Sequence, residues 1–591
     1  MRTAIFRRLK PLAKYLRRYR MGLVWGALAV VGTNTFGVLF PQVIKRAIDA
    51  MQLGVTRSAI LRFALLLLAV SACKGVFQFL ARWVIIGVSR DIEFDLRNDL
   101  FAHLERQPPV FYQRHRTGDI MARATNDLNA VRQLLGPAIM YSANTVVFTA
   151  GALFCMLRIS PWLTLCAFLP MPAASLLVQY FGHRIHHRFE RIQAMFSDIS
   201  ARAQENFSGA RLVRAFAQED AEIASFERAN QEYIHRSLYL VRLMGMFWPT
   251  LEFVLGLCMV VTLFVGGRMV VNHQLQLGAF VAFNTYMVLM TWPMIALGWV
   301  INLFQRGTAS VVRLDELMQE QPAIDDAAAD RSLADMTLTG EVEFRHLNFA
   351  YTDSSGNPVE VLHDVNLRIP AGGSLAIVGP TGCGKSTLVS LIPRLLDAAP
   401  GMVLVDGRPV REYPLATLRR SIGYVQQETF LFSDTIRENI AFGVESASDE
   451  QIERAARAAR IADEILEFPA GFKTAVGERG ITLSGGQKQR TAIARALLRD
   501  PRILILDDAL ASVDTYTEEQ ILNELHKQME GRTTIFISHR VSTVQNADRI
   551  AVLVDGRIAE LGTHDELIAR NGYYTSLYNK QQLEEEITVS N

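Results

Sequence analysis

Residues 379–386 read GPTGCGKS, and this stretch determines how the C-terminal half of the chain folds. It fits the pattern G-x-x-x-x-G-K-[ST], with an apolar strand-like run at 374–378 before it and a helix-like run at 387–391 after it. Glycines let consecutive backbone N–H groups face phosphate oxygens, Lys385 adds positive charge, and the Ser386 hydroxyl can ligate Mg²⁺. The stretch therefore predicts a nucleoside triphosphate site in an α/β domain, whereas a glycine turn before a structural helix would not require the Lys-Ser pair. We assign nucleotide binding to Gly379, Pro380, Thr381, Gly382, Cys383, Gly384, Lys385, Ser386 and Thr387.

The N-terminal half has a different composition. Three stretches, 133–157, 159–182 and 274–305, contain no Asp, Glu, Lys or Arg. Each is long enough to cross a bilayer as a helix. The chain of 591 residues is also too long for a single core. These stretches predict a membrane domain that precedes the nucleotide-binding domain.

Three further spans are expected at about 21–44, 63–81 and 244–267, which gives six in total. Lys74 interrupts the second of these and Glu252 the third. Ionisable residues inside a membrane are functional candidates by default, and Glu252 could meet a cationic drug or a lipid headgroup. Either side chain could instead form a structural pair or extend to the interface.

The orientation of the spans follows from the N-terminus, which is rich in basic residues, while the predicted outer loops are short and carry few charges. The basic residues are Arg2, Arg7, Arg8, Lys10, Lys14, Arg17, Arg18 and Arg20. They favour a cytoplasmic interfacial helix over 1–20, although a mitochondrial transit peptide has a similar composition. With six spans, both ends of the chain lie on the cytoplasmic side.

Charge and cysteine usage exclude other classes of protein. A net charge of +2, without a basic patch interleaved with aromatic residues, gives no support for nucleic-acid binding. Four of the five cysteines lie in apolar spans and none has metal-ligand spacing, so no disulfide framework is expected. Cys383 could be a reactive thiol at a helix N-terminus, or an incidental residue of the phosphate loop.

The charged stretches between the spans predict long cytoplasmic helices. Residues 89–132 and 183–242 are rich in helix formers, and we expect intracellular turns near 115–125 and 209–218 within a membrane domain over 21–318. Solvated helix faces would account for most of these charges equally well.

The remaining boundaries follow from composition. A linker is expected over 319–340, the nucleotide-binding domain over 341–580, and an acidic, disordered tail over 581–591.

A second motif follows the phosphate loop: residues 483–487 read LSGGQ. Ser484 and the amides of Gly485 and Gly486, with Gln487, would form an anion site at a helix start. A capped structural helix is the alternative reading of this motif alone. With both motifs in this order, the chain resembles an ATP-binding cassette (ABC) exporter half-transporter: six transmembrane helices with cytoplasmic extensions, fused to one α/β P-loop domain. The resemblance implies that this LSGGQ acts on ATP held by the other subunit of a dimer.

The resemblance also implies roles for single residues. Tyr351 resembles the aromatic residue that stacks on adenine, Gln427 the loop glutamine that touches Mg²⁺, and His539 the switch histidine that contacts the γ-phosphate. Residues 474–480 resemble the exporter-type loop that meets the intracellular turns, with Glu478 as its polar contact. This loop favours export over import.

The most informative departure from the family comes after the apolar strand 503–506. Asp507 fits the carboxylate that holds Mg²⁺, but Asp508 stands where the family has its catalytic glutamate, while Asp514 is retained further on. Aspartate is one methylene shorter, which withdraws the carboxylate by about 1.3–1.5 Å. A displacement of about 1 Å can cost about 10²-fold in rate. The sequence therefore predicts slow hydrolysis at this site.

A weak hydrolytic carboxylate beside an intact LSGGQ resembles one subunit of a heterodimeric bacterial exporter of drugs or lipids. Such a partner would carry a glutamate after its own Mg²⁺ aspartate. A homodimeric exporter or lipid flippase, and an ATP-gated channel or regulatory subunit, stay open as alternatives. The implied ligands are ATP, Mg²⁺, membrane lipids and a hydrophobic small molecule, and the implied location is a bacterial inner membrane.

Overall fold

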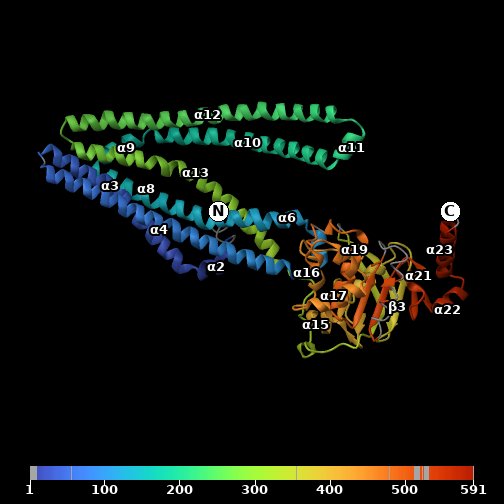
Figure 1. The fold of residues 1–591 in the computed structure, drawn as a ribbon. Helices are drawn as coiled ribbons and strands as arrows, with labels where there is room; N and C mark the ends of the chain where they lie inside the picture. The colour runs from blue at the N-terminus through green and yellow to red at the C-terminus, as the bar shows by residue number, and fades with distance from the viewer. Residues whose placement is uncertain are drawn as a thin grey trace. The chain divides into compact units, whose positions relative to one another are not determined.

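The computed structural model describes residues 9–54, 56–353, 356–477, 480–510, 520–521, 524 and 531–589 (Figure 1). The chain forms two compact units. Unit 1 consists of Met1–His103 and Gly118–Glu320, and unit 2 of Leu104–Thr117 and Gln321–Asn591. Unit 1 is helical and unit 2 contains two β-sheets with helices, so the predicted fusion of a membrane helical domain to an α/β domain is confirmed.

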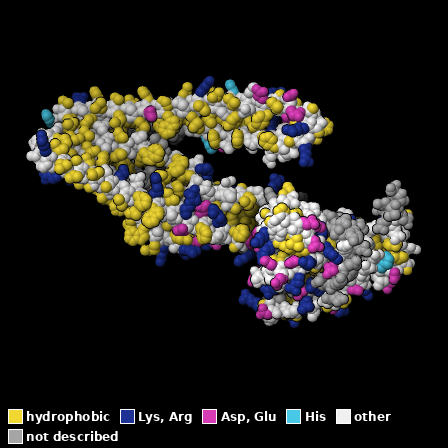
Figure 2. Space-filling model, viewed as in Figure 1, with side chains coloured by type: hydrophobic (Ala, Val, Ile, Leu, Met, Phe, Trp, Pro, Cys, Tyr) yellow, Lys and Arg dark blue, Asp and Glu magenta, His cyan; other side chains and the backbone are white. Residues whose placement is uncertain are grey.

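Unit 1 is built from long apolar helices whose outer surface is largely hydrophobic (Figure 2). Within the described part of the chain, five helices are long and apolar enough to cross a membrane. They are α3 (Arg20–Gln52), α4 (Arg57–Leu104), the continuous helix Thr117–Ile159 that contains α6 (Thr117–Ala122) and α8 (Ile139–Ile159), α12 (Glu219–Val271) and α13 (Leu277–Gln319). A short amphipathic start, α2 (Ala13–Arg18), precedes α3 and buries Tyr15.

The remaining predicted span, 159–182, is helical but interrupted. It consists of α9 (Pro161–Phe168) and the beginning of α10 (Met171–Ser208). Pro170 lies between the two helices. Proline lacks an N–H group and its ring clashes with the preceding turn, which favours a break here, although α3, α12 and α13 continue through Pro41, Pro249 and Pro293. The absence of charged residues over 159–182 predicts a stretch long enough to cross the membrane, but it does not predict the break between α9 and α10.

Helices α10 and α12 lie side by side and are joined by the short helix α11 (Ala210–Ala215) (Figure 1). This turn lies where the sequence predicted one, near 209–218. The far part of this arm keeps large apolar side chains exposed: Phe207 is 81% exposed and Phe216 is 68% exposed.

The other intracellular turn has two breaks, one on either side of α5 (Pro109–Arg114). The first lies at 105–108, before the predicted 115–125; the second, at His115 and Arg116, lies inside that range, and the chain is helical again from Thr117. The reason for the first break is the pair Pro108 and Pro109, which follows the end of α4 and starts α5 with proline at its first position. Gly118 does not form a turn. Val110 packs against the hydrophobic core of unit 2.

Unit 2 contains a six-stranded sheet in the order β10-β9-β3-β8-β7-β6. Its strands are β3 (Ser374–Val378), β6 (Ile422–Val425), β7 (Ile503–Asp507), β8 (Thr533–Ile537), β9 (Arg549–Val554) and β10 (Arg557–Gly562). All pairs are parallel except β9 with β10. Strands β7 and β8 are buried along their whole length, which explains their continuous apolar sequence.

A four-stranded antiparallel sheet in the order β2-β1-β4-β5 completes the β structure. Its strands are β1 (Val342–Thr352), β2 (Pro358–Ile369), β4 (Val403–Val405) and β5 (Arg408–Pro409). A separate apolar cluster holds the helices that surround the LSGGQ segment. These are α16 (Ile436–Ala441), α17 (Asp449–Ala458), α18 (Ala462–Glu467) and α19 (Gly485–Leu498).

The acidic end of the chain is helical, contrary to the expected disordered tail over 581–591. Helix α23 runs over Tyr573–Val589. Tyr574, in its first turn, is fully buried in a cluster with β9 residues and α22 (His564–Ala569). This packing anchors the helix at its start, which composition alone could not indicate.

Candidate functional site

The phosphate loop lies at the carboxyl end of the central strand β3 and leads into α14 (Lys385–Ser390). Its backbone requires glycine at two positions. Gly384 precedes α14 with a left-handed φ of 100°, and a Cβ on Gly379 would lie 2.0 Å from the carbonyl oxygen of Leu553. In a parallel sheet, ligands bind at the carboxyl ends of the strands, and here the loop lies at that edge.

A pocket of about 350 Å³ opens beside this loop. It brings together predicted residues from separate segments of unit 2, including Tyr351, Gln427, Asp507, Asp508 and His539. The rest of its lining is Val361, Thr381, Gly382, Gly384, Lys385, Ser386, Thr387 and Ile537. The volume falls within the range of about 300–1,000 Å³ found for small-molecule sites.

Lys385 and Ser386 are held in place by the protein itself. The Lys385 ammonium is buried and donates to the carbonyl oxygens of Gly379, at 2.9 Å, and Pro380, at 2.8 Å. Ser386 Oγ donates to Asp507 Oδ1 at 3.0 Å. These contacts fix the charged end of the lysine beside the loop, where phosphate oxygens would lie.

Asp507 is a buried carboxylate at the end of β7. Burial raises the pKa of Asp507; the hydrogen bond from Ser386 opposes the shift and the charge of Asp508 adds to it. A hard cation would compensate this buried negative charge, and a serine hydroxyl beside a carboxylate is a suitable oxygen donor set for Mg²⁺. The residues present therefore fit the ion that the sequence predicts.

Asp508 directly follows, with its side chain half-buried in the pocket lining. Its backbone N–H donates to the carbonyl oxygen of Ile537 at 2.9 Å, which ties it to the end of β8. Its φ is 49°, in the left-handed region that aspartate tolerates better than most residues. The carboxylate is therefore anchored at a fixed backbone position.

His539 is exposed at the pocket edge, and its backbone is held by a residue that sequence reasoning missed. Gln581 Nε2 donates to the carbonyl oxygen of His539 at 2.5 Å, and Gln581 Oε1 accepts from the N–H of Val541 at 2.8 Å. One amide side chain on α23 thus binds both sides of Arg540. Nothing in the sequence around 581 signals this contact, because 42 residues separate it from His539.

The LSGGQ segment forms the start of α19, with Ser484 as its N-cap. Ser484 Oγ accepts from Gln487 N at 3.2 Å, and Gln487 Oε1 accepts from Ser484 N at 2.9 Å. Gln487 Nε2 also donates to Glu464 at 3.0 Å, and Glu464 pairs with Arg490 at 2.6 Å. The capped-helix interpretation of Ser484 is therefore correct as far as local structure goes, but it does not exclude an anion site at the same helix start.

Within the described residues, the lining of the nucleotide pocket includes none of Ser484, Gly485, Gly486 and Gln487. Ser484 and Gly485 are instead exposed. The chain's own phosphate loop and its own LSGGQ are therefore separate surfaces of unit 2.

Two other predictions concern the loop and the pocket edge. Tyr351 OH lies 3.1 Å from Thr387 Oγ1, and its ring meets Phe349 edge-on.

Cys383 is buried, and burial raises the pKa of its thiol despite the nearby charge of Lys385. A raised pKa lowers the thiolate fraction, so the incidental reading of Cys383 fits better than the reactive one.

Four predicted residues lie elsewhere. Glu478 and Asp514 are outside the described residues. Lys74 and Glu252 line two different cavities of unit 1, of about 330 and 200 Å³. The structure therefore does not bring the two intramembrane charges together.

Comparison with known proteins agrees with this architecture. Two family models match, the ABC transporter transmembrane region over residues 23–294 and the ABC transporter model over residues 362–511. The chain is 34% identical to the probable multidrug resistance ABC transporter ATP-binding/permease protein YheI of Bacillus subtilis, over 98% of each chain. It is 36% identical to the multidrug resistance-like ATP-binding protein MdlA of Escherichia coli, over 97% of this chain and 96% of that protein.

Two further similarities extend over nearly the whole chain. An ATP-dependent lipid A-core flippase of Syntrophus aciditrophicus is 35% identical over 99% of this chain and 96% of its own length. The solved structure of a bacterial Atm1-family ABC exporter with ATP bound matches with a TM-score of 0.76 and 30% identity, covering 95% of this chain and 99% of that chain.

The fold and the nucleotide pocket together define an ATP-driven membrane transporter. The chain belongs to the ABC transporter family and is an exporter half-transporter, with one transmembrane region and one ATP-binding domain. It binds ATP, couples ATP hydrolysis to transport, and works as a dimer with a partner half-transporter or a second copy. It is a multi-pass protein of the bacterial inner membrane, with the ATP-binding domain in the cytoplasm.

Proposed function

We propose that this chain is one half of a heterodimeric exporter of hydrophobic or amphipathic compounds, in which its own phosphate loop forms a slow ATP site. Its LSGGQ segment completes the fast site of the partner. The partner carries a glutamate after its Mg²⁺ aspartate. Relatives named for multidrug resistance and for lipid A-core flipping support drugs or lipids as the substrate class.

The observation that carries the proposal is Asp508. It follows the buried Asp507, lines the pocket and is anchored by its hydrogen bond to Ile537. To regain the lost reach, the shorter side chain would need a backbone shift that disturbs this hydrogen bond. A general base must lie within about 2.6–3.2 Å of the proton it accepts. An aspartate in this place is therefore too short for fast hydrolysis.

The other pocket residues have separate roles in the same proposal. Lys385 and the loop amides bind the phosphates, Ser386, Asp507 and Gln427 hold Mg²⁺, which would neutralise phosphate charge, and Tyr351 stacks on the base. His539 contacts the γ-phosphate from the end of β8. Glu478 stays assigned to a contact with the intracellular turns, and Asp514 is the retained aspartate of the segment that follows Asp508.

Two surfaces support a partner chain. Ser484 and Gly485 are exposed and do not line the chain's own pocket, as expected if they serve a phosphate bound by another subunit. The arm α10–α11–α12 exposes the large apolar side chains of Phe207, Leu212 and Phe216 in a charged, cytoplasmic stretch. Such side chains need a covering surface, because exposed apolar clusters of this kind mark interaction sites.

The proposal is tested by purifying the full chain from its native host and identifying what accompanies it. We expect a second half-transporter of similar mass in equal amount, and ATP turnover by the pair that far exceeds turnover by this chain reconstituted alone. A pure homodimer that hydrolyses ATP at the rate of the pair would refute the unequal sites. Absence of ATP-dependent substrate accumulation in vesicles by an otherwise active pair would favour a channel or regulatory subunit.

A further inference from the structure

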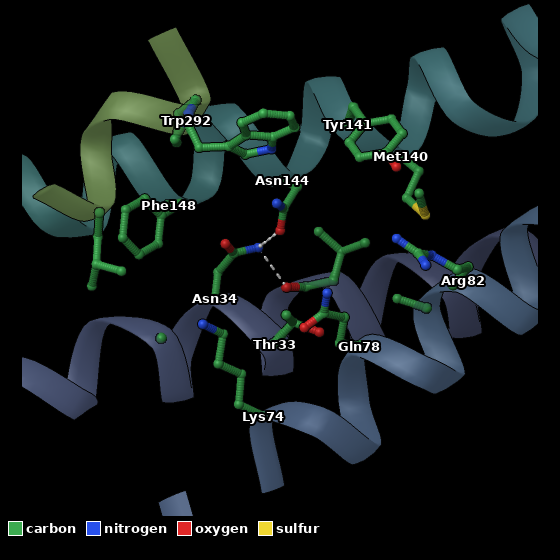
Figure 3. A pocket seen from close by; sticks show the side chains of 15 residues that line it. Thr33, Asn34, Lys74, Gln78, Arg82, Met140, Tyr141, Asn144, Phe148 and Trp292 are labelled. Carbon is green, nitrogen blue, oxygen red and sulfur yellow. Dashed lines mark hydrogen bonds between the residues drawn. The ribbon is translucent and has the colours of Figure 1, made fainter. Parts of the chain in front are cut away.

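A partly open cavity of about 330 Å³ lies in unit 1, between helices α3, α4, α8 and α13 (Figure 3). Lys74 is half-buried in its wall, and Gln78 and Arg82 are exposed. This volume falls in the range of about 300–1,000 Å³ typical of small-molecule sites. The lining residues are Val30, Thr33, Asn34, Gly37, Lys74, Gln78, Ala81, Arg82, Met140, Tyr141, Asn144, Phe148, Leu289, Trp292 and Pro293.

The charge of this cavity is entirely positive. Lys74 and Arg82 both line it, and its lining contains no Asp or Glu. In the described part of the chain, neither cation has an ion-pair or hydrogen-bond partner. The cavity therefore lacks a counter-charge. For Lys74, which lies inside the predicted span, the missing partner is costly and marks a functional site by default.

The two cations share one face of α4. They are eight residues apart with Gln78 between them, which is about 12 Å along the helix axis. In Figure 3, the Lys74 side chain points toward Asn34 and the Arg82 side chain toward Met140. Both side chains are long and flexible, so they can converge on one anionic group or take two.

The opposite walls supply further donors and apolar surface. Asn34 Nδ2 donates to Asn144 Oδ1 at 2.8 Å and to the carbonyl oxygen of Val30 at 2.8 Å, which fixes the amide pair across α3 and α8. Phe148 and Trp292 lie on the same side as Asn144 (Figure 3). A ligand in this cavity would meet the two cations on one side and Asn144 with the aromatic surface on the other, with the Asn34–Asn144 pair bridging the two sides.

We propose that this cavity binds an amphipathic anion, with a phosphate or carboxylate group held by Lys74 and Arg82 and an apolar body against Phe148 and Trp292. This inference rests on the proposed export function and narrows its substrate class. Lys74 lies inside the span and Arg82 just beyond the predicted cytoplasmic end at 81. The anionic group therefore enters from the cytoplasmic side. Glu252 belongs to the other cavity and takes no part.

The test uses the full chain in an uncharged maltoside detergent without nucleotide, with radiolabelled dodecyl phosphate as the probe and dodecyltrimethylammonium as its cationic counterpart. The variants are Lys74→Gln and Arg82→Gln. Arg268→Gln is the matched control, because Arg268 is an exposed cation on α12 outside the cavity lining. Each cavity variant should weaken dodecyl phosphate binding by about tenfold or more, since a charge-assisted hydrogen bond is lost.

Equal dodecyl phosphate affinity in the unmodified chain and both cavity variants would overturn the proposal, as would stronger binding of the cationic counterpart. If a Gln variant unfolds, Lys74→Arg keeps the charge and must retain binding. If the chain binds dodecyl phosphate through Lys74 but transports nothing in vesicles, the anion-site proposal stands and the export proposal fails. The two proposals can therefore fail separately.

Two sources of the anion are distinguished in nanodiscs. If phosphatidylglycerol competes with dodecyl phosphate while phosphatidylcholine does not, the ligand is an anionic lipid headgroup. If neither lipid competes, the ligand is an amphipathic solute. Both results support the shared chemistry, and competition by phosphatidylcholine alone would contradict it.

Discussion

Replacing Asp508 by glutamate should restore fast hydrolysis at this chain's own ATP site. The extra methylene moves the carboxylate outward by about 1.3–1.5 Å from a backbone position that the hydrogen bond to Ile537 fixes. A displacement of about 1 Å is worth about 10²-fold in rate. That factor corresponds to about 2.7 kcal/mol of activation free energy, since each tenfold step is about 1.36 kcal/mol. We therefore expect turnover by the reconstituted chain to rise by one to two orders of magnitude.

The assay is steady-state ATP hydrolysis by the chain alone in nanodiscs, with kcat and KM measured separately. The change should appear in kcat, because the carboxylate acts on attacking water and not on bound ATP. Asp508→Asn is the matched control: it keeps the shape, removes the charge and should abolish the residual rate. Because Asp508 has a φ of 49°, the glutamate variant carries a backbone cost of about 1 kcal/mol or more, so its thermal unfolding is measured in parallel.

Two results would refute this reasoning. A folded Asp508→Glu chain whose kcat equals that of the unmodified chain would show that carboxylate reach does not limit the rate. An unmodified chain that already turns over ATP rapidly as a homodimer would show that the pocket compensates for the shorter side chain.

Three further outcomes follow from the same pocket. Lys385→Ala should weaken binding of a fluorescent ATP analogue by about tenfold or more, because a charge-assisted contact to phosphate is lost; unchanged affinity would remove Lys385 from the site. Gln581→Leu should lower the kcat of the active dimer several-fold with little change in KM, because it frees the backbone on both sides of Arg540. The control Gln582→Leu should have no effect. Equal kinetics for both variants would show that the Gln581 contact is only structural. Cys383 should react with a maleimide at pH 7.5 more slowly than an unhindered thiol, since its pKa is raised by burial, and a fast reaction would show that the loop opens.

The nucleotide pocket could be predicted from sequence because its chemistry depends on short contiguous patterns. A phosphate loop requires glycines and a Lys-Ser pair at fixed spacing, and Asp507 follows an apolar strand whose end must reach the same edge of the sheet. Asp508 was identified by comparison with a family pattern, one residue further on. The phosphate loop and Asp507 carry their signal in the local sequence, whereas Tyr351, Gln427, Asp508 and His539 were assigned through the resemblance to the family.

What the sequence could not indicate depends on contacts between distant segments or on competing local signals. Gln581 reaches His539 across 42 residues, and an acidic stretch gives no sign that it is helical. The turn expected near 115–125 begins before that range, because Pro108 and Pro109 decide where α5 begins. Composition identifies a span but not whether a proline breaks it: α10 begins after Pro170, whereas α12 continues through Pro249.

The cavity near Lys74 also depends on contacts that the sequence does not indicate. A single intramembrane lysine could bind a ligand, form a structural pair or extend to the interface, and its neighbours are needed to choose among these. Arg82 lies one residue beyond the predicted span, so the sequence placed it outside the membrane and gave it no role. An anion site can be inferred only once the four helices that line the cavity are assembled. The assembled helices show the spacing of Lys74 and Arg82 on α4, the absence of acidic residues in the lining, and the amide pair of Asn34 and Asn144. In the proposed heterodimer, ATP that stays bound at this chain's slow site would keep the two ATP-binding domains in contact there while the partner's site cycles. Release of the proposed anion would then depend on hydrolysis at the partner's site, so the unequal rates and the cavity charge can be tested in the same complex.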